Sequence, residues 1–160
     1  MVSNRKILMV FGTRPEAIKM IPLYLKLKED SFNVKLCITA QHRDMLDEVM
    51  NLFNVNADHD LDIMKPNQSL SKLSSRLING LDPIYEAIKP DLVLVHGDTT
   101  SSYIAALVAF YRGIPVGHVE AGLRSGNIKS PFPEELNRKI VGNLADYHFA
   151  PTEKAKENLV

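Results

Sequence analysis

Four clusters of chemically reactive side chains each come directly after a short apolar run of the chain. In an open parallel sheet, ligands bind beyond the carboxyl ends of the strands, so a loop that follows a strand is a candidate part of a site. If the apolar runs are strands of one sheet, the clusters should meet at one rim. They are Gly12-Thr13-Arg14, Gln41-His42-Arg43, His96-Gly97-Asp98-Thr99 and His118-Val119-Glu120.

The carboxylates differ in how well a purely structural role explains them. Glu120 ends an apolar run, where a carboxylate has poor access to solvent unless it faces a cleft, so a functional role is favoured. Asp98 precedes a predicted helix and could equally cap it. Glu134 and Glu135 follow a proline in the first turn of another helix, where the helix dipole favours acids whether or not they act on a substrate.

The loop after the first apolar run is the candidate anion site. It has one glycine where a dinucleotide-binding fingerprint needs three, and the chain has no Walker sequence, so NAD and ATP are disfavoured and we expect no cofactor. A phosphate could bind at the predicted helix amino terminus beside Arg14 and Lys19. The alternative is that both cations are simply solvated.

Two histidines raise the question of a metal. His96 and His118 each stand two residues before an acid, so strand geometry would place His96 with Asp98 and His118 with Glu120. Metal sites usually show a more distinctive ligand pattern than these pairs. We therefore expect no metal.

The elements that would position these clusters alternate between strand and helix. Alternation of this kind favours right-handed crossovers and an α/β fold, a doubly wound parallel sheet that is Rossmann-like. With 160 residues, we expect a single domain over residues 1–160. The predicted strands are 7–11, 34–39, 92–95, 115–119 and 147–150, and the predicted helices are 15–30 with a kink or restart at Pro22, 44–53, 70–88, 100–112, 134–144 and one capped by Thr152.

Composition narrows the function classes. The 19 Lys and Arg balance 19 Asp and Glu, so no basic field attracts nucleic acid or an anionic membrane, and we expect neither as a partner.

The only cysteine, Cys37, lies in an apolar run and is expected to be a packed, inert thiol. The first apolar run is too short for a signal peptide, which predicts a cytoplasmic protein. The last predicted helix has no glycine or proline terminator, so we expect a longer chain to continue.

Five segments resemble the successive signature segments of bacterial non-hydrolysing UDP-N-acetylglucosamine 2-epimerases, and together they span nearly the whole chain. The resemblance implies a two-domain enzyme of the GT-B architecture, usually a homodimer, of which this chain is the amino-terminal half without its carboxyl-terminal nucleotide-binding domain. The segments are VFGTRPEAIKM, TAQHRDMLDEV, LVLVHGDTTSS, PVGHVEAGLRSG and SPFPEELNRKI.

The resemblance also implies an activity and residues for it. The family interconverts UDP-N-acetylglucosamine and UDP-N-acetylmannosamine for cell-surface polysaccharide synthesis, by eliminating UDP to leave a 2-acetamidoglucal and then adding it back without a redox cofactor. By motif match, Asp98, Glu120 and Glu134 fall on its acid and base positions. Arg14 and Lys19 match residues near the departing diphosphate.

The resemblance extends in part to a regulatory site. Bacterial members are activated by a second UDP-N-acetylglucosamine beside the active site, and Gln41, with its neighbour His42, matches the segment that contacts it. Asp44 and Asn67 stand where some regulated members carry Gln and Arg.

The chain alone is expected to be inactive or nearly so, because a catalytic histidine and most uridine contacts of the family lie in the second domain.

Two other functions are compatible with the same architecture. One is hydrolysis or glycosyl transfer from the sugar nucleotide, which would release UDP. The other is a non-catalytic module that binds a sugar nucleotide and works only with a partner that carries the other half.

Overall fold

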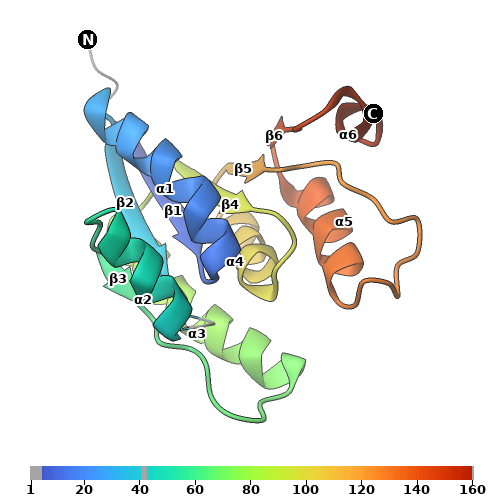
Figure 1. The fold of residues 1–160 in the computed structure, drawn as a ribbon, viewed down its shortest axis with the longest axis horizontal. Helices are drawn as coiled ribbons and strands as arrows, with labels where there is room; N and C mark the ends of the chain where they lie inside the picture. The colour runs from blue at the N-terminus through green and yellow to red at the C-terminus, as the bar shows by residue number, and fades with distance from the viewer. Residues whose placement is uncertain (1–4, 41–42, 160) are drawn as a thin grey trace.

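The apolar runs of the chain form one six-stranded sheet in the computed structural model, which describes residues 5–40 and 43–159. Every pair of neighbouring strands is parallel, in the order β3-β2-β1-β4-β5-β6 (Figure 1). The strands are β1 (Lys6–Phe11), β2 (Asn33–Ile38), β3 (His59–Asp60), β4 (Leu92–His96), β5 (Val116–Val119) and β6 (Tyr147–Phe149).

The chain starts in the middle of this sheet and reverses its direction of growth once. From β1 it passes outward to β2 and β3, and it then crosses back to add β4, β5 and β6 on the other side of β1. The strand order therefore switches between β1 and β4. At such a switch point the loops leave toward opposite faces and open a crevice beyond the carboxyl ends of the strands, where α/β proteins bind their ligands.

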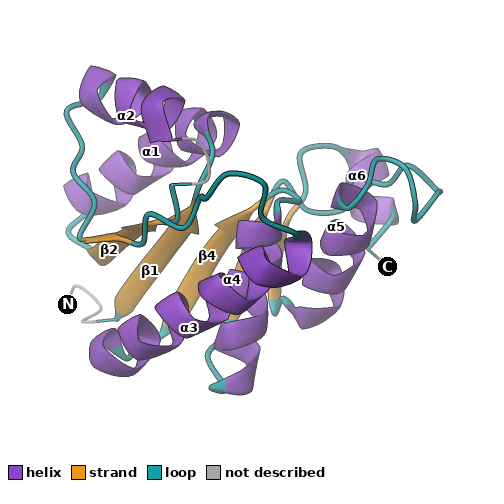
Figure 2. Ribbon diagram, turned by 90° about the horizontal axis from the view of Figure 1, so that it is seen from below, coloured by secondary structure: helices purple, strands orange, loops and turns teal. Residues whose placement is uncertain are grey.

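Helices cover both faces of the sheet (Figure 2). Successive side chains of a strand point to opposite faces, and in β1 the side chains of Leu8 and Val10 pack in one layer while those of Met9 and Phe11 pack in the other. The first layer includes α3, α4 and α5, and the second includes α1 and α2. The helices are α1 (Arg14–Glu29), α2 (Arg43–Leu52), α3 (Leu70–Ile88), α4 (Thr100–Tyr111), α5 (Glu134–Leu144) and α6 (Glu153–Glu157).

The predicted α/β fold is confirmed, with element boundaries shifted by a residue or two. One strand was missed: β3 has only two residues, His59 and Asp60, and no apolar alternation, and it exists because the end of β2 offers it a pairing edge. Of the two outcomes predicted for Pro22, a kink or a restart, the restart does not occur, since α1 runs through Pro22 as one helix. Within the described residues, no helix is long and apolar enough to cross a membrane.

Cys37 is fully buried in β2, as its apolar surroundings predict. Burial raises the pKa of its thiol to about 12. A thiol of this kind stays protonated and unreactive at neutral pH.

Candidate active site

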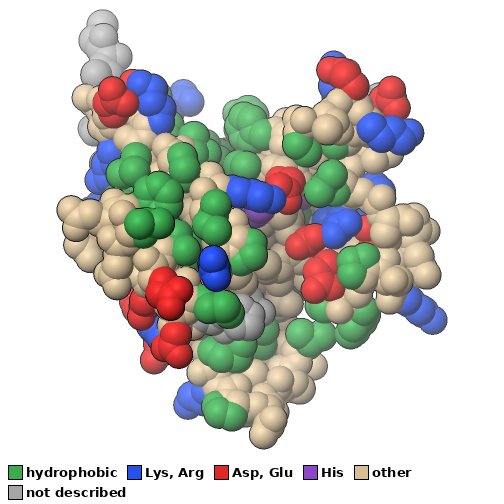
Figure 3. All heavy atoms as spheres, in the orientation of Figure 1, with side chains coloured by type: hydrophobic (Ala, Val, Ile, Leu, Met, Phe, Trp, Pro, Cys, Tyr) green, Lys and Arg blue, Asp and Glu red, His purple; other side chains and the backbone are tan. Residues whose placement is uncertain are grey.

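A cleft of about 520 Å³ opens at the switch point between β1 and β4. Its walls are the loop after β1 with the start of α1, the loop after β4, the end of β5 and the start of α5. In the space-filling view, basic, acidic and histidine side chains gather in the hollow between α1 and α5 (Figure 3). Nearly all the predicted site residues that the structure describes lie on this cleft: Arg14, Lys19, Asp98, Glu120 and Glu134.

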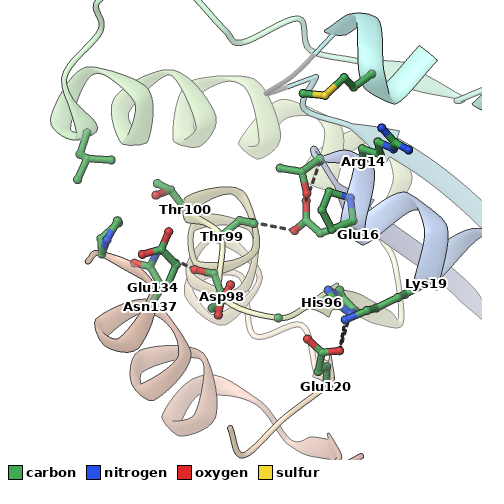
Figure 4. A pocket seen from close by; sticks show the side chains of 16 residues that line it. Arg14, Glu16, Lys19, His96, Asp98, Thr99, Thr100, Glu120, Glu134 and Asn137 are labelled. Atoms are coloured by element: carbon green, nitrogen blue, oxygen red, sulfur yellow. Dashed lines mark hydrogen bonds and ion pairs between the residues drawn. The ribbon is translucent and has the colours of Figure 1, made fainter. Parts of the chain in front are cut away.

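Glu120 follows β5 and faces the cleft, as its place after an apolar run predicts. Its backbone leaves the strand conformation, with a φ of 63°. Its Oε2 forms an ion pair with Nζ of Lys19 from α1 and lies 3.6 Å from Nε2 of His96 (Figure 4). The Glu120 side chain is therefore held between a cation and a buried imidazole.

Asp98 lies in the loop between β4 and α4 and is held by α5. Its carboxylate forms an ion pair with Arg138, and the side-chain amide of Asn137 donates to its backbone oxygen at 2.9 Å. It does not cap α4, because Thr99 is the cap and accepts a hydrogen bond from the backbone N–H of Ser102 at 3.1 Å. The alternative prediction, that Asp98 caps this helix, is therefore wrong.

The two acids that begin α5 have different surroundings. Glu134 lines the cleft, and its Oε2 is buried with no hydrogen-bond partner in the described part of the chain. Glu135 is fully buried, accepts a hydrogen bond from the backbone N–H of Ser125 at 3.0 Å and forms an ion pair with Arg138. Burial alone would raise the pKa of Glu135, but the Ser125 hydrogen bond and the Arg138 charge outweigh it and lower that pKa. Glu135 therefore anchors the loop that contains Ser125, and Glu134 faces the cleft.

Glu16 is a site residue that reasoning from the sequence did not single out. Its buried Oε2 accepts from the backbone N–H groups of Gly12 at 2.9 Å and of Thr13 at 2.8 Å. Its Oε1 accepts from the hydroxyls of Thr99 and Ser102, each at 2.8 Å. One carboxylate thus ties the loop after β1 to the loop after β4. A sequence signal was available, because a Glu three residues after a helix-capping Thr is typical of a capping box.

This arrangement corrects the expected phosphate site. Two backbone N–H groups of the loop before α1 are already bonded to Glu16, so they are not free to bind an anion. The side chains of Arg14 and Lys19 line the cleft and remain available to an anion.

The predicted histidine pairs are also corrected. His96 approaches Glu120 rather than pairing with Asp98, and Nε2 of His118 is 2.7 Å from the backbone oxygen of Gly97. Strand alternation does not reach Glu120 because its left-handed φ turns the chain at the end of β5. Burial lowers the pKa of both histidines, against the opposing charge of Glu120 at His96 and the opposing Gly97 hydrogen bond at His118, whose pKa falls to about 4.

The remaining predictions concern metals and the second cluster. No group of three His, Cys, Asp or Glu side chains among residues 5–40 and 43–159 is arranged to hold a metal ion. Gln41 and His42 lie outside the described residues. Their neighbour Arg43 bonds both carboxylate oxygens of Asp60, at 2.6 and 2.9 Å, and also pairs with Asp62.

Comparison with known proteins decides the family. The family profile described as UDP-N-acetylglucosamine 2-epimerase matches residues 25–160. The chain belongs to the UDP-N-acetylglucosamine 2-epimerase family. A family member from Yersinia pestis is 57% identical over 156 residues, which are 97% of this chain and 42% of that protein. The chain thus spans less than half the length of this curated relative.

Solved structures of family members share the fold described here. The UDP-GlcNAc 2-epimerase from Neisseria meningitidis, bound to UDP-GlcNAc, superposes with a TM-score of 0.92 at 57% identity, over 96% of this chain and 42% of that one. The epimerase from Methanocaldococcus jannaschii, in complex with UDP-GlcNAc and UDP, gives a TM-score of 0.91 at 34% identity, over 96% of this chain and 42% of that one. The epimerase fold is therefore retained at distant sequence identity.

Proposed function

We propose that this chain is the amino-terminal half of a non-hydrolysing UDP-N-acetylglucosamine 2-epimerase with the GT-B architecture. The enzyme would interconvert UDP-N-acetylglucosamine and UDP-N-acetylmannosamine by eliminating and re-adding UDP. The observation that carries the proposal is the set of carboxylates that three separate elements bring to one cleft at the switch point of the sheet: Asp98, Glu120 and Glu134.

Inversion at carbon 2 explains why one cleft would hold several carboxylates. A proton must leave one face of the sugar and arrive at the other, and a single group cannot easily reach both faces. Glu120 approaches from the end of β5, whereas Asp98 and Glu134 belong to the side of the cleft formed by α5 and the loop it holds (Figure 4). Carboxylates on different walls supply the two directions that the reaction needs.

The departing diphosphate needs positive charge that is already in place. Arg14 and Lys19 lie on the α1 wall of the cleft, and Lys19 is half exposed. Fixed cations at the position where negative charge develops stabilise a leaving group without rearrangement of solvent. We assign both side chains to the diphosphate.

The rest of the enzyme belongs to the same proposal. The cleft would be completed by a carboxyl-terminal nucleotide-binding domain, and the assembled protein would be a homodimer. We infer a cytoplasmic location and a role in cell-surface polysaccharide synthesis. If a second sugar nucleotide activates the enzyme, Gln41 and His42 are the proposed contacts.

The test uses this chain fused to the carboxyl-terminal part of the Neisseria meningitidis relative, called the fused enzyme below. Asp98→Asn, Glu120→Gln and Glu134→Gln each remove one carboxylate with little change of shape, and each should lower kcat by about 100-fold or more. Glu29→Ala on the solvent side of α1 is the control and should leave kcat unchanged. Near-normal turnover in all three variants would overturn the proposal, and net release of free UDP would point to a hydrolase or transferase instead.

A further inference from the structure

His96 is a buried residue of the cleft whose imidazole makes no hydrogen bond to the described residues. It ends β4 with 4% of its surface exposed, and it lines the cleft. Neither ring nitrogen has a hydrogen-bond partner in the described part of the chain. A buried polar group left unpaired costs free energy, so its retention needs a reason. The reason should lie in what the imidazole faces.

The imidazole faces Glu120. Its Nε2 lies 3.6 Å from Oε2 of that carboxylate, slightly too far for a hydrogen bond. The same Oε2 forms the ion pair with Nζ of Lys19. One oxygen therefore has two competing partners, a fixed and buried imidazole and a half-exposed, flexible lysine on the α1 wall.

A ligand in the cleft would change this competition. A diphosphate that draws Lys19 away would leave the imidazole as the nearest remaining partner of Oε2, and a movement of less than 1 Å would complete a hydrogen bond. The lysine is free to turn because its side chain is 50% exposed, whereas the imidazole is confined by its burial.

Burial of the imidazole favours its neutral form. Burial lowers the pKa of His96, so the ring is neutral at pH 7 and can accept a proton. Lys19 acts in the same direction as burial, so its departure toward a diphosphate would strengthen the imidazole as a base. The groups that act in the opposite direction are Glu120 at the end of β5, Glu16 on α1 and Asp98 in the following loop.

We propose that His96 is a positioning residue that acts through Glu120, holding Oε2 after Lys19 turns to the diphosphate and taking up the proton that Glu120 exchanges with carbon 2. This inference rests on the proposed epimerase function. The C2–H bond breaks, its electron pair forms the C1–C2 double bond, and the diphosphate oxygen leaves with the C1–O pair. The O–H bond formed on Glu120 then breaks as its proton moves to Nε2, which restores the carboxylate. The imidazolium returns the proton to Glu120 or loses it to water once the cleft empties.

The first test measures the pairing without any catalysis. Imidazole NMR of this chain over a pH series gives the pKa of His96, and His59 on β3, at the far edge of the sheet, is the internal reference. Glu120→Gln should lower the His96 pKa and Lys19→Met should raise it, each by about half a pH unit or more, with His59 unchanged. A His96 titration that responds to neither substitution would overturn the proposal.

The second test separates proton uptake from simple hydrogen bonding in the fused enzyme. His96→Gln keeps a side chain that can bond Oε2 but cannot carry the proton, so kcat should fall about 10- to 100-fold with little change in KM. The acid limb of the kcat–pH profile should also shift, because only the carboxylates would then contribute to it. The opposite result would be a His96→Gln variant whose kcat stays within twofold of the unaltered fused enzyme, while His96→Phe lowers kcat. In that case His96 only donates or accepts a hydrogen bond, and proton uptake is refuted.

The NMR test can be decided without the proposed function, whereas the second test requires turnover. A fused enzyme with unaltered residues that exchanges no hydrogen at carbon 2 would refute the epimerase assignment itself. In that case the NMR titrations would still decide whether His96 and Glu120 are coupled, because they need no turnover.

Discussion

At the scale of single residues, Glu16 decides whether the loops of the cleft keep their places. Its carboxylate accepts hydrogen bonds from two backbone N–H groups before α1 and from two hydroxyls of α4 and its cap. All of these donors are on segments that carry proposed site residues, namely Arg14 and Asp98. A buried carboxylate with this many partners positions the site rather than reacting in it.

Glu16→Ala should destabilise the chain by about 3 kcal/mol, because it leaves buried donors without an acceptor. Urea unfolding followed by circular dichroism measures the change. Glu29→Ala is the matched control on the exposed side of the same helix, where its ion pair with Lys26 is solvated, and it should change stability by no more than about 0.5 kcal/mol. Equal effects of the two substitutions would show that Glu16 does not hold the loops together.

The positions of the cleft carboxylates could be predicted from the sequence. Their partners could not, because these depend on tertiary packing and on local backbone turns. Asp98 and Glu120 could be placed on one rim because both follow apolar strands of a sheet whose carboxyl ends meet. The partners that hold them, Arg138 and Lys19, come from helices whose rotation about their axes is fixed only by tertiary packing. The histidine pairs failed because left-handed residues, Gly97 after His96 and Glu120 after β5, interrupt the alternation on which they depended.

At the scale of elements, the apolar runs predicted the strands well because each is buried on both faces of a parallel sheet. Short strands were harder to predict from the sequence. β3 depends on the edge of β2 rather than on its own two residues. The order of the strands could not be predicted from the local sequence pattern either. That pattern allows β4 to pair beside β1 or beside β3, and in the structure it pairs beside β1.

The loop after β5 packs closely on α6, and two glycines test this contact. Gly122 and Gly126 have similar positive φ values of 85° and 81°. A Cβ on Gly122 would lie 2.0 Å from the backbone oxygen of Ala155, whereas a Cβ on Gly126 would meet nothing within 4 Å. The two positions therefore share the backbone strain of a non-glycine residue and differ in steric contact.

Gly126→Ala should cost about 1 kcal/mol from backbone strain alone. Gly122→Ala should cost at least about 2 kcal/mol more, because backbone atoms must move, and overpacking typically costs 1–3 kcal/mol. Urea unfolding gives both values, and hydrogen exchange should show faster opening of α6 only in the Gly122 variant. Equal destabilisation by the two alanines would contradict a close contact between this loop and α6.

At the scale of the whole molecule, buried neutral histidines should make stability depend on pH. His118 is fully buried, and burial lowers its pKa to about 4, whereas an unfolded histidine titrates near 6.5. Between these values the unfolded chain binds a proton that the folded chain does not, so stability falls as the pH is lowered from 6.5 toward 4. His96 contributes in the same direction because its pKa is also lowered.

His118 should remove up to about 1.4 kcal/mol of stability per pH unit in this window. Unfolding free energies measured from pH 7 to 4 should therefore decline, and His118→Gln should make the decline shallower while it retains a donor for the Gly97 oxygen. Slopes rather than absolute stabilities are compared, so any packing cost of the substitution cancels. An unchanged slope in His118→Gln would contradict the burial of a neutral imidazole.

The most direct measurement is proton NMR of UDP-N-acetylglucosamine in deuterated water, with this chain alone and then with the carboxyl-terminal part of the Neisseria meningitidis relative supplied. The account predicts deuterium at carbon 2 and the appearance of UDP-N-acetylmannosamine only in the combined sample. A combined sample that is folded and binds the nucleotide, yet leaves the hydrogen at carbon 2 in place, would contradict it.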